Sequence, residues 1–125
     1  MEAADYAALD NPDTYILDKG GYIFMALYQG QPVGTCSLIK MDNGQYDYEL
    51  AKMGVSPLVQ GKGIGLRLGN TIIQKAKALG GKTLFLESNT KLKPAIRLYQ
   101  KLGFQKVPHQ ASVYERSNIQ MVLEL

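Results

Sequence analysis

Apolar residues alternate with turn signals in the first half of the chain, and this pattern predicts three consecutive strands. The strands are expected at Tyr22–Tyr28, Val33–Met41 and Tyr46–Val55. Gln29-Gly30-Gln31-Pro32 separates the first two, and Asp42-Asn43-Gly44 separates the last two. Asn-Gly is among the strongest short signals for a tight hairpin. Three strands joined by such turns form an antiparallel meander.

After Val55 the apolar period changes to that of a helix. Ile64, Leu68, Ile72 and Ala76 recur at four-residue spacing, which places them on one helical face. Gly80-Gly81 then ends the helix in the usual C-terminal manner.

The remaining chain predicts a strand, a second helix and two strands. Lys82–Glu87 is a short apolar strand. Asn89 or Thr90 is expected to cap the second helix, which Gly103 ends. We therefore predict a single α/β domain with a mixed sheet over residues 1–125. The apolar face of the second helix consists of Ala95, Leu98, Tyr99 and Leu102. The last two strands are expected at Phe104–Val107 and Ile119–Leu125.

Composition narrows the class of protein. With 46% hydrophobic and 20% charged residues the chain can build a core. The net charge of +3 is spread without a basic stripe, so no nucleic-acid partner is expected. No stretch has the ~18 apolar residues of a membrane span, and the acidic, alanine-rich start is not a signal peptide. We expect a cytoplasmic protein that binds no metal, in which Cys36 is a buried structural thiol and His109 a loop residue.

The informative segment is the glycine-rich stretch between the third strand and the first long helix. Gly61, Gly63 and Gly65 let the backbone adopt positive φ and approach a ligand closely. The first turn of the helix adds unpaired N–H groups and the positive end of the helix dipole. Together they predict a site for phosphate or pyrophosphate, with Lys62 and Arg67 at its rim. The alternative is a turn that only lets strand and helix pack closely.

Two other phosphate-binding classes fit less well. A P-loop NTPase requires GxxxxGK[ST], which is absent. A dinucleotide site would use Gly63-x-Gly65 with Glu87 as the ribose-binding acid. However, Leu68 occupies the third glycine position, and the strands ahead of the loop are antiparallel.

Two motifs resemble the GNAT superfamily of N-acetyltransferases. Gln60-Gly61-Lys62-Gly63-Ile64-Gly65 matches the (Gln/Arg)-x-x-Gly-x-(Gly/Ala) signature. Asn89, followed by the segment from Ala95 to Phe104, is similar to the second motif of that family, A-x-x-L-Y-x-K-x-G-F. The resemblance covers most of the chain, from about Tyr22 to Leu125. Within the superfamily, the chain looks like bacterial amine-acetylating members that are sometimes fused to MarR-type regulators.

The resemblance implies a mode of cofactor binding. Backbone amides of Gln60, Gly61, Lys62, Gly63, Ile64 and Gly65 would hold the pyrophosphate of acetyl-CoA. Met53, Gly54 and Val55 would pair with the pantetheine arm, and Asn89 would contact the pantetheine or the acyl end. In such folds the central strands of the mixed sheet splay apart, and the thioester lies in the gap.

The expected reaction is acetyl transfer to a primary amine, which must lose a proton before it attacks. Glu49 is the candidate base, because regular alternation places it on one face with Ala51, Met53 and Val55, where apolar neighbours raise a carboxyl pKa. Tyr99, at the position of the family's tyrosine, is the candidate acid for the departing thiolate. The alternatives for Glu49 are a carboxylate at the exposed end of a strand or a structural ion pair. The alternative for Tyr99 is core packing.

The segment ahead of Tyr22 is shorter than such domains usually have. Residues 2–10 predict one short helix, whereas the family usually builds part of the acceptor site there. Two interpretations are open: the N-terminal segment is truncated, or a partner subunit completes the site. The second interpretation suggests a homodimer. A non-catalytic acyl-CoA-binding module is the alternative function, and the sequence does not identify the acyl acceptor.

Overall fold

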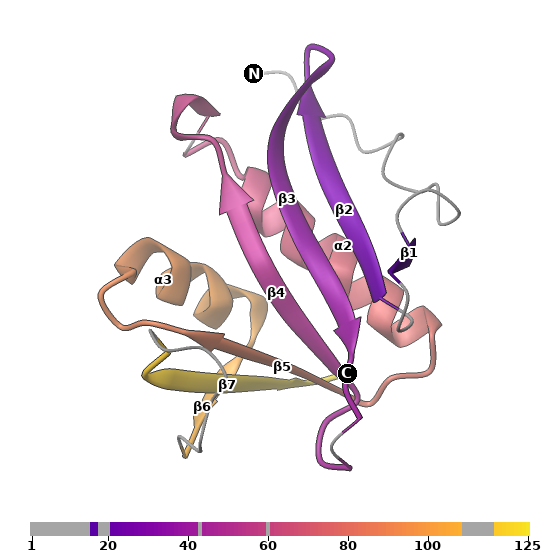
Figure 1. Cartoon of the computed structure of the whole chain (residues 1–125). Coiled ribbons are helices and arrows are strands. Elements are labelled where there is room, and N and C mark those ends of the chain that lie inside the picture. The colour runs from indigo at the N-terminus through magenta and orange to yellow at the C-terminus, as the bar shows by residue number, and fades with distance from the viewer. Residues whose placement is uncertain (1–15, 18–20, 43, 60, 109–116) are drawn as a thin grey trace.

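The computed structural model describes residues 16–17, 21–42, 44–59, 61–108 and 117–125, and Figure 1 shows how their elements are arranged. The expected helix at 2–10, Gln60 of the glycine motif and His109 lie outside these residues. In chain order the elements are β1 (Ile16–Leu17), β2 (Gly21–Tyr28), β3 (Gln31–Lys40), β4 (Tyr48–Val55), η2 (Pro57–Val59), α2 (Ile64–Ala78), β5 (Thr83–Ser88), α3 (Lys93–Leu102), β6 (Gln105–Val107) and β7 (Ile119–Glu124).

The strands form one mixed sheet in the order β1-β2-β3-β4-β5-β7-β6. The predicted meander is confirmed, because β2, β3 and β4 pair antiparallel in sequence order. Gln29 and Gly30 join β2 to β3 with φ values of 51° and 78°, the double positive φ of a type I′ hairpin turn. The pairing between β4 and β5 is parallel, and it makes the sheet mixed.

Both helices bury their apolar faces in one core. α2 packs across the meander, where Leu68 and Ile72 contact the buried side chains of β2, β3 and β4. α3 packs on α2, and a Cβ on Gly69 would meet Leu102 of α3 at 2.5 Å. Neither of these helices, of 15 and 10 residues, is long and apolar enough to cross a membrane.

The expected cap of α3 is wrong. The helix begins at Lys93 with Leu92 at the N-cap position and Pro94 in its first turn, and no side chain caps it. The Oδ1 atom of Asn89 instead accepts a hydrogen bond from the Lys91 amide at 2.9 Å. Asn89 therefore closes a turn ahead of the helix, a conformation that competes with capping for Asn side chains.

The two central parallel strands touch at one end only. Their register contains two pairs, Tyr48 with Leu84 and Glu49 with Phe85. The Asp47 carboxylate reinforces this end by accepting hydrogen bonds from the amides of Lys82 at 2.7 Å and Thr83 at 3.2 Å. Beyond it β4 and β5 diverge, as Figure 1 shows. The splay that the family resemblance implied is thus present.

A β-bulge in β4 changes which side chains share a face. Ser37 pairs with Ala51 and Thr35 with Gly54, so two residues of β4, Lys52 and Met53, stand opposite one residue of β3. Lys52 has a φ of 55°, in the left-handed region. Such a bulge inserts one residue and bends the strand that carries it.

The bulge overturns the expectation that Glu49 and Val55 lie on the same face. Leu50 belongs to the core beneath α2. Val55 pairs with Gly34, whose Cβ would lie 3.0 Å from Leu68 of α2. Leu50 and Val55 therefore both face α2 although they are five positions apart, which regular alternation forbids. Glu49 consequently lies on the face opposite to Val55.

The left-handed backbone at Lys52 predicts an unusual response to glycine. Lys52→Gly should leave the free energy of unfolding unchanged or raise it by up to about 1 kcal/mol, because glycine adopts positive φ without steric cost. Lys52→Val should lower it by about 1–2 kcal/mol, because β-branched residues tolerate positive φ poorly. Urea unfolding measures both values.

The matched control is Lys40→Gly, at an exposed lysine of β3 outside the positive-φ region. It should lower the free energy of unfolding by about 0.5–1 kcal/mol. An equal loss for Lys52→Gly and Lys40→Gly would contradict a left-handed bulge.

Candidate active site

The divergence of β4 and β5 opens a cleft of about 250 Å³. One wall comes from β4 beyond its last contact with β5, and the other from the end of β5 and the loop and helix that follow. The cleft is therefore a direct consequence of the short parallel register. Its lining residues are Leu50, Ala51, Lys52, Met53, Glu87, Ser88, Asn89, Leu92, Tyr99 and Ser117.

Tyr99 belongs both to the core and to this cleft wall. Its side chain is 6% exposed, and its ring lies edge-on to Phe104 with centroids 6.1 Å apart. Burial, with a smaller contribution from nearby Cys36, raises the pKa of Tyr99 from 10.0 to about 12. The phenol thus keeps its proton at neutral pH and can donate it. The sequence left two interpretations of Tyr99, core packing and proton donation. Its position in both the core and the cleft wall is compatible with both.

Glu49 lies at the closed end of the fork. It is half-buried, and it pairs with Phe85 at the last point where β4 and β5 touch. It is not among the residues that line the cleft. The structure therefore does not bring Glu49 and Tyr99 together in the cleft wall.

Glu87 is a carboxylate of the cleft wall, whereas the sequence indicated it only as the ribose-binding acid of a dinucleotide site. Its Oε1 atom accepts hydrogen bonds from Ser117 Oγ and Gln120 Nε2, each at 3.0 Å. Two features of the sequence could have indicated it. It is the single acid of an otherwise apolar strand, and it lies near the carboxyl end, where α/β sheets bind ligands.

Asn89 lines the cleft within a loop that is fixed by β7. Asn118 accepts a hydrogen bond from the Thr90 amide at 2.9 Å and donates one to the Thr90 hydroxyl at 3.1 Å. The Asn118 amide also donates to the Ser88 carbonyl at 3.0 Å. The loop from β5 to α3 therefore has a defined shape at the cleft.

The glycines at positions 61, 63 and 65 are required for different physical reasons. Gly61 and Gly63 have φ values of 81° and 77°, and a Cβ on either would meet no atom within 4 Å. Gly65 does not have positive φ, but its Cβ would lie 3.0 Å from Leu98 of α3. Close packing thus explains Gly65, whereas Gly61 and Gly63 shape an open turn.

The N-terminus of α2 has the properties of an anion site. Gly63 is its N-cap, no side chain caps it, and no acidic residue lies in its first turn. The first N–H groups of a helix carry partial positive charge and need acceptors. Lys62 lies nearby, with its ammonium 6.0 Å from the centroid of the Tyr28 ring.

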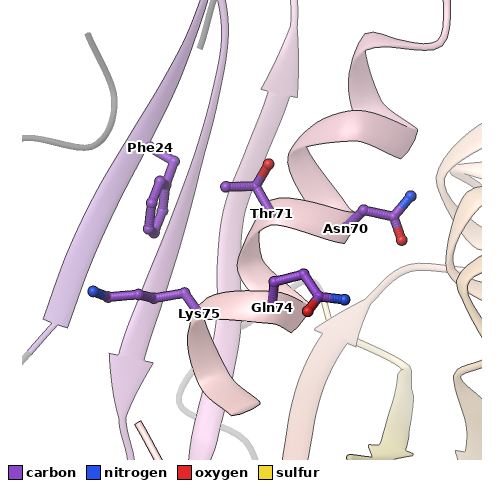
Figure 2. A pocket seen from close by; sticks show the side chains of 5 residues that line it. All are labelled: Phe24, Asn70, Thr71, Gln74 and Lys75. Carbon is purple, nitrogen blue, oxygen red and sulfur yellow. The ribbon is translucent and has the colours of Figure 1, made fainter. Parts of the chain in front are cut away.

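A second hollow, of about 420 Å³, lies between β2 and α2 (Figure 2). It is lined by Phe24, Asn70, Thr71, Gln74 and Lys75. The Thr71 hydroxyl donates to the Arg67 carbonyl at 2.9 Å, and the Lys75 ammonium lies 4.6 Å from the Tyr22 ring centroid. Among the described residues that line this groove there is no acidic side chain.

Cys36 is a buried thiol, as expected from the sequence. Its side chain is 0% exposed, and its sulfur lies 3.7 Å from the Ala51 carbonyl oxygen. Burial raises its pKa from 9.0 to about 12. Across the part of the chain that the structure describes, no three His, Cys, Asp or Glu side chains are grouped to hold a metal ion.

Comparison with known proteins identifies the family. Residues 2–104 match the Acetyltransferase (GNAT) family. The chain is 34% identical over 83 residues to the uncharacterized N-acetyltransferase YjgM of Escherichia coli (strain K12), covering 66% of this chain and 50% of YjgM. It is 36% identical over 72 residues to the N-alpha-acetyltransferase RimI of Mycobacterium tuberculosis, covering 58% of this chain and 44% of RimI.

A solved structure agrees over nearly the whole chain. The Bacillus subtilis acetyltransferase in complex with CoA has a TM-score of 0.72 and 26% identity, covering 98% of this chain and 86% of that chain. The fold, with its splayed sheet, and the two sequence motifs are those of the acyltransferase class of domains. The chain belongs to the GNAT family of acetyltransferases, which confirms the resemblance seen in its sequence. It spans about half the length of the curated relatives described above.

The buried thiol and phenol predict a loss of stability at alkaline pH. Cys36 and Tyr99 both have raised pKa values in the folded protein, so the folded state holds these protons more tightly than the unfolded state. Their contribution is complete below the unfolded pKa values and is lost as the pH rises from about 9 towards 12. The urea concentration at the unfolding midpoint should therefore decrease as the pH is raised from about 8 to about 10.5.

Variants separate the two groups from the rest of the chain. Cys36→Ala and Tyr99→Phe should each reduce this fall, whereas Tyr28→Phe, at a half-buried tyrosine of β2, should retain the wild-type slope. A slope that neither core variant changes would show that these two groups do not titrate on unfolding.

Proposed function

We propose that this protein transfers the acetyl group of acetyl-CoA to a primary amine in a ternary complex. The observation that carries the proposal is one continuous arrangement of three parts. These are the glycine turn at the N-terminus of α2, the edge of β4 beyond Glu49, and the cleft wall that holds protonated Tyr99. The B. subtilis acetyltransferase, similar over nearly the whole chain, was solved with CoA.

The pyrophosphate of the cofactor would bind at the glycine turn. The backbone amides from Gly61 to Gly65 meet the positive end of α2, and Lys62 adds charge nearby. Gln60 would extend this cradle at its start. The space beside Gly61 and Gly63 leaves room for phosphate oxygens to approach the backbone.

The pantetheine arm would run along β4 into the cleft. Pairing with β5 stops at Glu49, so the edge of β4 from Leu50 to Val55 does not continue the ladder. Along this edge the amides of pantetheine would pair with the backbone at Met53, Gly54 and Val55, the positions that the family resemblance implies for it. The thioester would then lie beside Tyr99 and Asn89, which both line the cleft.

In the reaction, the amine nitrogen forms a bond to the acetyl carbon and the bond from that carbon to sulfur breaks. The ammonium must first lose a proton, and Glu49 would accept it through water. The departing thiolate would take a proton from Tyr99. The nitrogen would lose its second proton to solvent as the amide forms, and solvent would restore the proton of Tyr99. A phenol held protonated by burial suits this role. The reaction requires only an accessible primary amine as acceptor. RimI is an N-alpha-acetyltransferase by name, so the amino termini of peptides are the first acceptors to test. The expected homodimer stays a prediction.

Cofactor binding is tested at two glycines with the same backbone conformation. Gly63 and Gly80 have φ values of 77° and 82°, and a Cβ on either meets no atom within 4 Å. Alanine at either position should lower the free energy of unfolding by about 1 kcal/mol. Only Gly63→Ala should weaken acetyl-CoA binding in calorimetry, by about tenfold.

Gly80 lies beyond the opposite end of α2 and serves as the control. Equal affinities for Gly63→Ala and Gly80→Ala would argue against a pyrophosphate site at the helix N-terminus.

Catalysis is tested at the proposed acid and base. Tyr99→Phe should lower kcat by about 10²-fold, because the thiolate loses its proton donor, while acetyl-CoA affinity changes little. Glu49→Gln should lower kcat by a similar factor, most strongly when the amine is fully protonated. Thiol release with peptide and small-molecule amines measures turnover.

The results also distinguish an enzyme from a binding module. Binding of acetyl-CoA by the wild type without turnover of any amine would favour the non-catalytic alternative. Full activity in Glu49→Gln would remove Glu49 from the mechanism.

A further inference from the structure

Two polar side chains interrupt an apolar face of the sheet where it reaches the cleft. Gln120 of β7 stands directly opposite Glu87 of β5, and Val122 stands opposite Phe85 in the same ladder. Residues opposite each other share a face, as do residues two apart on one strand. This face therefore changes from an apolar pair to a polar pair next to the cleft.

The Gln120 side chain is deeply buried for a carboxamide, with 4% of its surface exposed. Burial of such a group costs free energy unless hydrogen bonds replace those to water. Its Nε2 atom donates to Glu87 Oε1 at 3.0 Å. An apolar pair in place of Glu87 and Gln120 would continue the face of Phe85 and Val122 and avoid the cost of burying polar groups. The core therefore does not explain why these two residues are polar.

The hydrogen bonds occupy one carboxylate oxygen of Glu87 and not the other. Ser117 Oγ and Gln120 Nε2 both donate to Oε1, and each carboxylate oxygen offers about two lone pairs. Within the described part of the chain, Oε2 takes part in no hydrogen bond or ion pair. Because Glu87 lines the cleft, Oε2 is the oxygen left for a molecule bound there.

We propose that Gln120, together with Ser117, is a positioning residue that holds the Glu87 carboxylate as the recognition group for the protonated amine of the acceptor. The inference rests on the proposed function, since it assigns the acceptor end of the same cleft. A primary amine with a pKa near 10 arrives as an ammonium ion at neutral pH. A carboxylate whose other oxygen is already fixed can receive an ammonium N–H without first losing its own rotational freedom.

Two carboxylates then have different roles in the acetyl transfer. Glu87 binds the ammonium at the open part of the cleft, and Glu49, at the closed end, remains the proposed proton acceptor. Gln120 does not touch the substrate and acts only through Glu87. Its removal should therefore affect the affinity for cations and have little effect once Glu87 has lost its charge.

The test measures binding of n-butylammonium chloride to the full chain without CoA. The methyl signal of Ala51, which lines the cleft, is followed by ¹H–¹³C NMR, and n-butanol serves as the neutral probe. The proteins are the wild type, Gln120→Met, Glu87→Gln, the double variant and Gln105→Met. Gln105 is an exposed glutamine of β6 outside the cleft, so Gln105→Met is the same chemical change at a site without this role.

The expected result is saturable binding of n-butylammonium but not of n-butanol. Gln120→Met should weaken it by about tenfold, and Gln105→Met should leave it unchanged. In the Glu87→Gln protein the further change Gln120→Met should have less than about a twofold effect, since the two residues act as one unit. A purely structural role would give similar losses in both backgrounds.

The proposal is overturned by equal affinity in Gln120→Met and wild type, by an undiminished effect in the Glu87→Gln background, or by failure of the wild type to prefer the ammonium. If Gln120→Met does not fold by circular dichroism, Ser117→Ala replaces it, because it removes the other donor to Oε1. An unchanged affinity in Ser117→Ala then overturns the proposal. Failure of the proposed function is seen separately, as absence of acetyl-CoA binding in calorimetry, while the ammonium titration remains interpretable.

Discussion

The arrangement of this protein depends on how briefly β4 and β5 pair. Two residue pairs and the Asp47 carboxylate hold the strands together at one end. The bulge at Lys52 bends β4, and the loop and helix after β5 contribute Leu92 and Tyr99 to the space that opens. A longer parallel register would close the cleft and pair the β4 edge that the proposed cofactor needs. The cleft thus exists because β4 and β5 form no further ladder hydrogen bonds beyond Glu49 and Phe85.

Two requirements, packing and ligand access, meet in the glycine-rich turn. Gly65 and Gly69 let α3 approach α2 closely, because a side chain at either would meet Leu98 or Leu102. That approach places Tyr99 of α3 in the cleft wall. Gly61 and Gly63 instead provide positive φ beside open space. The same short motif therefore supports both the proposed pyrophosphate site and the position of the proposed acid.

The core and the cleft are also linked through titratable groups. Burial raises the pKa of both Cys36 and Tyr99, and nearby Cys36 adds a smaller contribution at Tyr99. A phenol that remains neutral throughout the physiological range stabilises the core and can still donate its proton to a leaving thiolate. The Glu87 carboxylate, by contrast, is held by hydrogen bonds from Gln120 of β7 and from Ser117, two positions before β7. Burial therefore controls the protonation of Tyr99, whereas hydrogen bonds fix the orientation of Glu87.

Local periodicity and turn chemistry determined most of the fold from the sequence alone. The meander, α2, the end of α3 at Gly103 and the two family motifs all depend on residues close together in the chain, whose preferences are legible without neighbours. Tertiary structure decided the rest. The face of Glu49 depended on a bulge set by pairing with β3, and the turn at Asn89 replaced the expected cap. The partnership of Glu87 with Gln120 joins residues 33 positions apart, and only the register between β5 and β7 brings them together.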